Sequence, residues 1–172
     1  MLTLVSTGEG GRTAVFSDGR IEITIQEGLW PGGAEDGPLY ERRVAYRAFG
    51  PSAARPSAED AVLATVADQA LGGLWVPLVT YVDLRELLRL PLDLEYVKAR
   101  AASLRLSRAL HGATLLAGHF FPEVADAAAA ARPELGFAER IAVEKVVDGA
   151  RDPAKLRHLR GAEAAARAVV AP

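Results

Sequence analysis

The chain of 172 residues contains no cysteine, which excludes disulfide bonds and thiolate metal ligands. Aromatic residues are scarce, at 6% of the chain, and there are only three histidines. Basic and acidic residues nearly balance, at 20 and 22, so the net charge of −2 gives no overall attraction to nucleic acid or to acidic membranes. With half of its residues hydrophobic and 24% charged, the chain has the composition of an ordinary globular protein.

Long apolar runs are also lacking. The two most apolar stretches, Leu74 to Leu84 and Leu110 to Phe121, are shorter than the roughly 20 residues that a membrane-spanning helix needs. The segment Met1 to Ser6 has neither the basic start nor the long apolar centre of a secretory signal. These features, with the absence of cysteine, predict a cytoplasmic protein that does not contact membranes.

The first fifty residues have the pattern of an antiparallel sheet. Ile21, Ile23 and Ile25 alternate with polar residues, which is the period of two expected of a strand with one buried face. Val15 and Phe16 precede Ser17-Asp18-Gly19, and Asp-Gly favours a tight hairpin turn. Two further strands are predicted on either side of these, at Leu2 to Ser6 and at Tyr40 to Phe49.

Helical patterns follow a proline-containing linker at residues 50–56. Ser57 and Asp93 are good N-cap residues, because their side-chain oxygens can accept a free amide of the first helical turn. The longest helix is predicted from about Leu94 to Phe121, and residues 74–82 are compatible with either a strand or a helix. The expected fold class is therefore α+β, with a meander of three to four strands followed by a helical bundle around one long helix. Residues 1–50 would form the β part and residues 57–172 the helical part, as one compact domain or two closely packed subdomains.

Basic residues form two clusters that are candidates for nucleic-acid binding. The first lies on one side of the predicted long helix, and the second lies near the C-terminus. Together they comprise Lys98, Arg105 and Arg108, then Arg151, Lys155, Arg157 and Arg160. Such groups can bind phosphates, but solvated helix faces paired with nearby acids give the same pattern. No aromatic residues are interleaved with these charges, which favours the solvated faces.

Two features suit contacts with a protein partner or a second copy of the chain. Ala109, Ala113 and Ala117 recur every four residues, and such a row of small side chains lets another helix approach closely. Trp30 lies in a loop rich in glycine and proline, where its large ring must either fold back on the core or meet a partner. Folding back is the more common outcome for such a residue.

Catalytic motifs are weak. No phosphate-binding loop, dinucleotide fingerprint or nucleophile elbow is present, and no cofactor or metal is predicted. Asp83 follows an apolar segment, as acids do in metal-dependent nucleases, with Asp68, Glu86 and His119 as neighbouring candidates. The sequence therefore predicts a non-enzymatic interaction or regulatory protein that self-associates, with nucleic acid as a candidate partner. The alternative is a small metal-dependent hydrolase or nuclease that uses Asp83 and the neighbouring acids.

Overall fold

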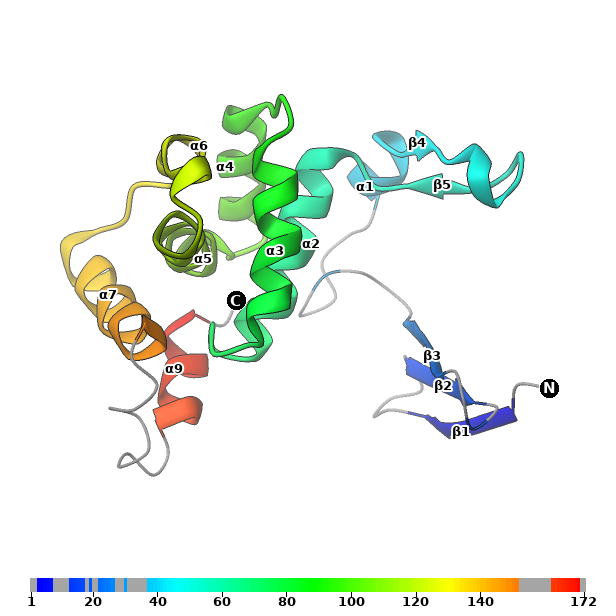
Figure 1. Cartoon of the computed structure of the whole chain (residues 1–172), viewed down its shortest axis with the longest axis horizontal. Coiled ribbons are helices and arrows are strands. Elements are labelled where there is room, and N and C mark those ends of the chain that lie inside the picture. The colour runs from blue at the N-terminus through cyan, green and yellow to red at the C-terminus, as the bar shows by residue number, and fades with distance from the viewer. Residues whose placement is uncertain are drawn as a thin grey trace. The chain divides into compact units, whose positions relative to one another are not determined.

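A computed structural model describes residues 3–7, 13–17, 19, 22–26, 30, 37–151 and 162–170 of the chain (Figure 1). The chain divides into two compact units, residues 1–37 and residues 38–172, each of which is described by itself. None of the helices in the described part of the chain is long and apolar enough to cross a membrane.

The described residues of the first unit include three strands. These are β1 (Thr3–Thr7), β2 (Thr13–Ser17) and β3 (Glu22–Gln26), and they pair antiparallel in chain order. Thr13 pairs with Gln26 and Ser17 with Glu22, so the predicted hairpin across Ser17-Asp18-Gly19 is confirmed. Gly19 has a φ of 85°, a left-handed conformation that glycine adopts without strain, and its amide donates to Ser17 Oγ. The predicted isoleucine face lies outside the described side chains.

Helices dominate the second unit. After α1 (Gly37–Glu41), which begins at the boundary between the units, come a two-stranded ribbon and then the main helices. The helices are α2 (Ala58–Leu71), α3 (Leu78–Leu88), α4 (Leu94–Ser103), α5 (Ser107–Phe120), α6 (Ala125–Ala131), α7 (Phe137–Arg151) and α9 (Ala162–Val170). A short 3₁₀ helix, η4 (Pro122–Val124), joins α5 to α6.

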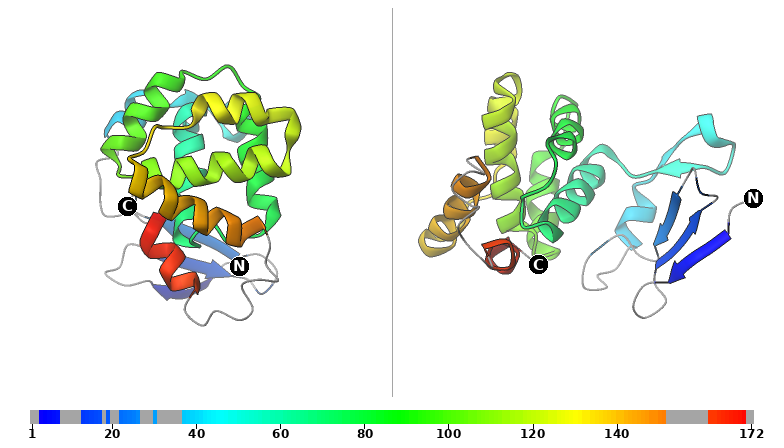
Figure 2. Two further views of the ribbon diagram at one scale, coloured as in Figure 1. Left: turned by 90° about the vertical axis from the view of Figure 1, so that its left-hand side faces the viewer. Right: turned by 60° about the horizontal axis from the view of Figure 1, so that its bottom comes forward.

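Helix α5 is the centre of this unit. It contacts α2, α3, α4, α6, α7 and α9, and Figure 2 shows α9 (red) lying beside α7 (orange). Leu110, Ala113, Leu116 and Ala117 of α5 are completely buried. Since a fully buried leucine stabilises the folded state by about 1.5–3 kcal/mol, the core of the unit is concentrated around this helix.

The two predicted helix caps are confirmed. Ser57 Oγ accepts the amide of Asp60 at the start of α2, and Asp93 Oδ1 accepts the amide of Tyr96 at the start of α4. Residues 74–82, which the sequence left ambiguous, turn and then enter α3 at Leu78. Asp83, the candidate acid of the hydrolase alternative, lies inside α3.

The prediction of one long helix at Leu94 to Phe121 is wrong, because the segment breaks into α4 and α5. Arg105 adopts a φ of 59°, and the amide of Leu106 bonds back to the carbonyl of Ala101 at 2.7 Å. Leu104 and Leu106 are both buried at the break. In a continuous helix these two residues would point about 200° apart, so one of them would leave the core. The burial of both leucines therefore explains the break.

The predicted fourth strand at Tyr40 to Phe49 is also wrong. Its residues form the end of α1, the two-residue strand β4 (Val44–Ala45) and the 3₁₀ helix η3 (Arg47–Phe49). Strand β4 pairs with β5 (Ala54–Arg55) and not with the first sheet. The predicted fold class, a meander of up to four strands before a bundle around one long helix, is therefore replaced by a largely helical chain. Its larger unit is organised around the short central helix α5.

Candidate functional site

Acidic side chains from the first turn of α2 hold an arginine that lies just after α1. Arg42 Nη2 donates to Glu59 Oε2 at 3.0 Å, and Arg42 Nε lies 3.7 Å from Asp60 Oδ2. The guanidinium carbon of Arg42 also lies 3.8 Å from the ring centroid of Tyr96 on α4, which is a close cation–π contact. One arginine therefore joins the segment after α1 to both α2 and α4.

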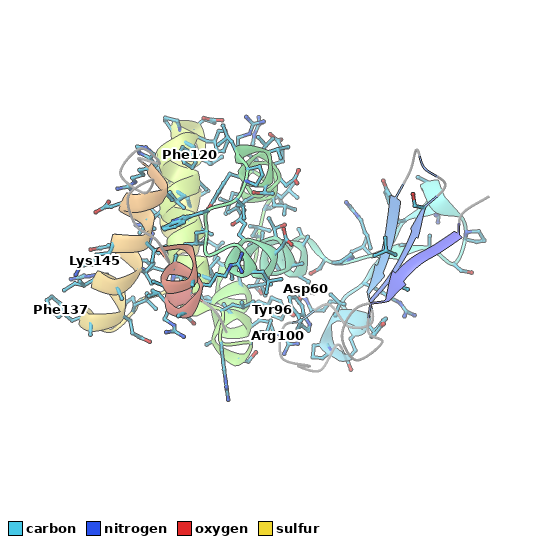
Figure 3. All side chains as sticks on the ribbon, turned by 90° about the horizontal axis from the view of Figure 1, so that it is seen from below. Asp60, Tyr96, Arg100, Phe120, Phe137 and Lys145 are labelled. Atoms are coloured by element: carbon cyan, nitrogen blue, oxygen red, sulfur yellow. The ribbon has the colours of Figure 1, made fainter. Side chains whose placement is uncertain are left out.

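Asp60 is the buried centre of this group, with no exposed surface. Its Oδ1 accepts a hydrogen bond from Tyr96 Oη at 2.9 Å, and its Oδ2 accepts one from Ser57 Oγ at 2.8 Å. Figure 3 labels Asp60 on α2 and both Tyr96 and Arg100 on α4. A buried carboxylate is costly unless it is paired and hydrogen-bonded, and Asp60 has both kinds of partner.

Glu59 completes the arrangement by accepting the backbone amide of Asp93 at 3.1 Å. Burial opposes ionisation of Glu59, but hydrogen bonds from backbone amides, Ser57 and Arg42 outweigh it and lower its pKa. Burial raises the pKa of Tyr96, and the hydrogen bond to Asp60 and the charge of Asp60 raise it further. We name Arg42, Ser57, Glu59, Asp60 and Tyr96 the clamp. Because its polar groups bond mainly to one another, the clamp fastens the segment after α1 to α2 and α4.

A β-ribbon extends from the element that the clamp holds. Strands β4 and β5 pair through Val44 with Arg55 and Ala45 with Ala54, and Tyr46 N donates to Ala53 O at 2.8 Å. The ribbon extends away from the helices of its unit (Figures 1 and 2). We name residues 43–55 the arm. Its arginines, Arg43, Arg47 and Arg55, are all exposed, and Tyr46 is 40% exposed.

The first basic cluster predicted from the sequence is divided by the break between α4 and α5. Lys98 on α4 lies 3.4 Å from Glu95, one helical turn away. Arg105 is exposed at the break itself, and Arg108 is half-buried in the first turn of α5. The shared face was predicted for a continuous helix, which the chain does not form.

Arg151 is the one member of the second basic cluster that lies among the described residues. Arg151 Nη1 donates to Asp148 Oδ1 at 3.3 Å on α7. Lys155, Arg157 and Arg160 lie outside the described residues. Whether these arginines and lysines bind nucleic acid stays a prediction.

The residues proposed for an interface are buried within the chain. Ala109, Ala113 and Ala117 have no exposed surface, and the helix that carries them is covered by the chain's own helices. The row of small side chains therefore serves packing inside the unit. Trp30 is only 4% exposed, so its ring is buried and not presented at the surface.

The acids proposed for a hydrolytic site lie on two helices, Asp68 on α2 and both Asp83 and Glu86 on α3. Asp68, Asp83 and Glu86 are exposed, and Glu86 accepts hydrogen bonds from Arg85 and Arg89. Among the described residues, no three histidine, aspartate or glutamate side chains come together in a way that could hold a metal ion. His119 is exposed near the end of α5, and its ring contacts Phe120.

Residues 5–122 match a known protein family, which is described as uncharacterised nucleotidyltransferase. The match covers more than half of the chain. The chain belongs to this nucleotidyltransferase family. No curated protein and no solved structure is significantly similar to it.

Membership of a nucleotidyltransferase family corrects the function predicted from the sequence. The prediction of a non-enzymatic interaction or regulatory protein is wrong, because the matched family is one of group-transfer enzymes. The alternative, a metal-dependent hydrolase or nuclease built on Asp83, is wrong for the same reason. The first prediction relied on the lack of a catalytic motif and on candidate docking surfaces, and the second on the local pattern at Asp83. The family match instead extends over the sheet and most of the described helices.

Enzymes that act on nucleotide phosphates commonly use divalent metal ions held by carboxylates and substrate phosphates. The described residues of this chain do not fit such a centre. Glu59 and Asp60 are adjacent, but their oxygens already accept hydrogen bonds from Arg42, Ser57, Tyr96 and the amide of Asp93. We therefore assign no step through a metal ion to the described residues.

Sequence reasoning missed the arm. The sequence predicts a strand at Tyr40 to Phe49, which includes residues 43–49 of the arm, and does not indicate a binding surface there. The available signal was composition, because residues 42–56 contain four arginines and two aromatic residues but no aspartate or glutamate. Arg42 and Tyr96 were missed for a different reason, since they meet only through the packing of α2 against α4.

Proposed function

We propose that this protein catalyses nucleotidyl transfer from a nucleoside triphosphate to an acceptor. The observation that carries the proposal is the family match over residues 5–122. It covers the sheet of the first unit, the arm, the clamp and the helices through α5.

In this reaction a nucleophilic oxygen of the acceptor attacks the α-phosphorus of the nucleotide. A new oxygen–phosphorus bond forms, and the bond from the α-phosphorus to the oxygen that bridges it to the β-phosphate breaks. Pyrophosphate leaves with the electron pair of that bond, and the acceptor loses its proton to a base. Charge develops on the leaving pyrophosphate, and cations or hydrogen-bond donors stabilise such charge in enzymes.

We propose that the second unit acts as a scaffold for this reaction. The clamp joins α2, α4 and the root of the arm through Arg42, so substitutions there would act through stability and position. The contribution of the helical unit is therefore expected in binding of the substrate or acceptor and not in the bond-breaking step.

Release of pyrophosphate tests the proposal. The full chain is incubated with each of the four nucleoside triphosphates, with Mg²⁺ or Mn²⁺, and with acceptors of three classes: oligonucleotides, proteins and small alcohols. We expect pyrophosphate to form only when both a nucleotide and a suitable acceptor are present. Release of inorganic phosphate in place of pyrophosphate would indicate hydrolysis of the γ-phosphate and would contradict nucleotidyl transfer.

Self-association and a cytoplasmic location stay predictions from the sequence. Light scattering coupled to gel filtration measures the first directly, and a strict monomer at high concentration would contradict it. Fractionation of cells that express the full chain measures the second, and recovery outside the cytoplasm would contradict it.

A further inference from the structure

We propose that the arm, residues 43–55, binds single-stranded nucleic acid. This surface goes beyond the transfer reaction proposed above, because binding of a strand needs neither a nucleoside triphosphate nor a metal ion. Four features of the arm carry the inference: its exposure, its charge, its aromatic rings and the attachment of its root.

The arm buries little of its own surface. Val44, Ala45, Tyr46, Arg47, Ala48, Ala54 and Arg55 are all exposed, so side chains from both faces of the ribbon are accessible. An isolated two-stranded ribbon is only marginally stable in water, since it has no covered face to support it. A partner that contacts the exposed side chains would therefore stabilise the arm.

The charge of the arm is of one sign. Arg43, Arg47 and Arg55 are exposed, and within the described residues none of them forms an ion pair. Many cations on the helices differ in this respect. Ion pairs join Arg85 to Glu86 and Glu123, Arg89 to Glu86, Lys98 to Glu95, Arg140 to Glu144 and Arg151 to Asp148. The positive charge of the arm is therefore available to an anionic partner in a chain whose net charge is negative.

Aromatic rings accompany this charge. Tyr46 is 40% exposed, and the guanidinium carbon of Arg55 lies 5.7 Å from the centroid of its ring. Tyr40, on α1 just before the arm, is 61% exposed. Proteins that bind single strands combine a cationic surface that follows the phosphates with aromatic rings on which bases stack. An acidic protein surface would use the arginines but would gain less from exposed tyrosines.

The root of the arm is held in place. Arg42, the residue immediately before the arm, bonds to Glu59 and contacts Tyr96, which ties it to two helices of the core. The arm also ends at Arg55, two residues before the Ser57 cap of α2. Both ends of the ribbon are therefore attached to α2, one through the contacts of Arg42 and the other through the chain itself.

Fluorescence anisotropy of the full chain tests the inference. The probes are fluorescein-labelled homopolymers of deoxythymidine and of uridine, about 20 nucleotides long so that they exceed the ~4–16 nucleotides that one small binding surface occupies. EDTA is included, and no nucleoside triphosphate is added. We expect binding at low salt that weakens as salt rises. For three phosphate contacts, log K should fall against log salt with a slope of about −2.

The triple variant R43A/R47A/R55A should bind at least tenfold more weakly at low salt, with a flatter salt dependence. The triple R43K/R47K/R55K keeps the charge and should keep the slope, although it loses the stacking and forked geometry of arginine. Y46A should weaken binding and leave the slope unchanged. The matched control is R89A/R140A/K145A, which removes three exposed charges, one at the C-cap of α3 and two on α7, and should bind as the unaltered chain does.

Equal binding by R43A/R47A/R55A and the unaltered chain would overturn the inference, as would equal losses in the arm triple and the control triple. Preferential binding of polyglutamate over both oligonucleotides would assign the arm to an acidic protein partner and would also overturn it. Circular dichroism and thermal unfolding should be the same for all variants, because the altered side chains are exposed. Since the assay contains no nucleotide or metal ion, its outcome is independent of whether pyrophosphate is released in the transfer assay.

Discussion

Tyr96 Oη donates a hydrogen bond of 2.9 Å to Oδ1 of Asp60, a carboxylate with no exposed surface. The two residues lie 36 positions apart, on α4 and α2. This bond links the two helices whose first turns hold Arg42 and the root of the arm.

Replacing Tyr96 with Phe removes the hydroxyl and leaves one oxygen of a buried carboxylate without its donor. We expect the variant to be about 1–3 kcal/mol less stable, which is the usual cost of an unsatisfied buried polar group. Urea unfolding followed by circular dichroism measures this loss. The control is Tyr40→Phe, because Tyr40 is 61% exposed, and its unfolding midpoint should not change. Equal midpoints for the unaltered chain and Tyr96→Phe would show that the bond contributes nothing.

His111 makes stability depend on pH. Its Nδ1 lies 2.9 Å from the carbonyl oxygen of Pro133, and burial lowers its pKa against the opposing effect of that hydrogen bond. The charges of Arg132 and Arg140 lower the pKa further, and that of Glu144 raises it. Because the folded chain has the lower pKa, the unfolded chain binds the proton first as pH falls.

Stability should therefore fall as pH decreases from about 6.5, the value in unfolded chains, through the lower pKa of the folded state. Replacing His111 with Gln should remove this part of the pH dependence, as measured by urea unfolding between neutral pH and about pH 5. His119→Gln is the matched control, because His119 is exposed. If the stability of His111→Gln fell as much over this pH range as that of the unaltered chain, His111 would not be the source of the pH dependence.

The break between α4 and α5 predicts opposite effects of glycine at two nearby arginines. Arg105 has a φ of 59°, a left-handed conformation that costs an ordinary residue about 1–2 kcal/mol. Arg105→Gly should therefore stabilise the chain by roughly 0.5–1 kcal/mol, after the greater flexibility of unfolded glycine is subtracted. Arg108→Gly, inside α5, should destabilise it by about 1 kcal/mol. Thermal unfolding of the two variants tests the break, and destabilisation of the same size in both would argue for a continuous helix.

The packing of α5 against α7 predicts a contrast between two glycines of α5. A β-carbon on Gly112 would collide with Leu74 Cδ1 and lie 3.1 Å from Val143 Cγ1. Gly112→Ala should therefore cost about 1–3 kcal/mol through overpacking. A β-carbon on Gly118 would meet nothing closer than 3.5 Å, so Gly118→Ala should gain up to about 1 kcal/mol from helix propensity. Denaturant unfolding of both variants measures the contrast, and a stable Gly112→Ala would contradict this packing.

Local chemistry explains which parts of the fold could be predicted. Ser57 and Asp93 were found because a cap depends on the next three residues, and the hairpin at Gly19 because a tight turn depends on glycine. The break at Arg105 could not be found, since the burial of both Leu104 and Leu106 is decided by other helices.

The residues of the clamp and of the arm were harder to find from the sequence. Arg42, Asp60 and Tyr96 meet only after α2 packs against α4, so no spacing along the chain indicates them. Arg105 and Arg108 were predicted to bind nucleic acid because they were expected on one side of a continuous helix. The arm contains fewer cations than the two predicted basic clusters together. Its lack of acids and its exposure indicate a binding surface only once the structure shows that these residues form an exposed ribbon.

Transfer of label from nucleoside triphosphates tests the proposed reaction most directly. Two parallel incubations of the full chain with a divalent metal ion and acceptors of all three classes, oligonucleotides, proteins and small alcohols, differ only in whether the α-phosphate or the γ-phosphate is radioactive. Nucleotidyl transfer predicts that the α-label appears on the acceptor and that the γ-label leaves in pyrophosphate. Label from the γ-phosphate on the acceptor, or no label on the acceptor from either position, would contradict the account.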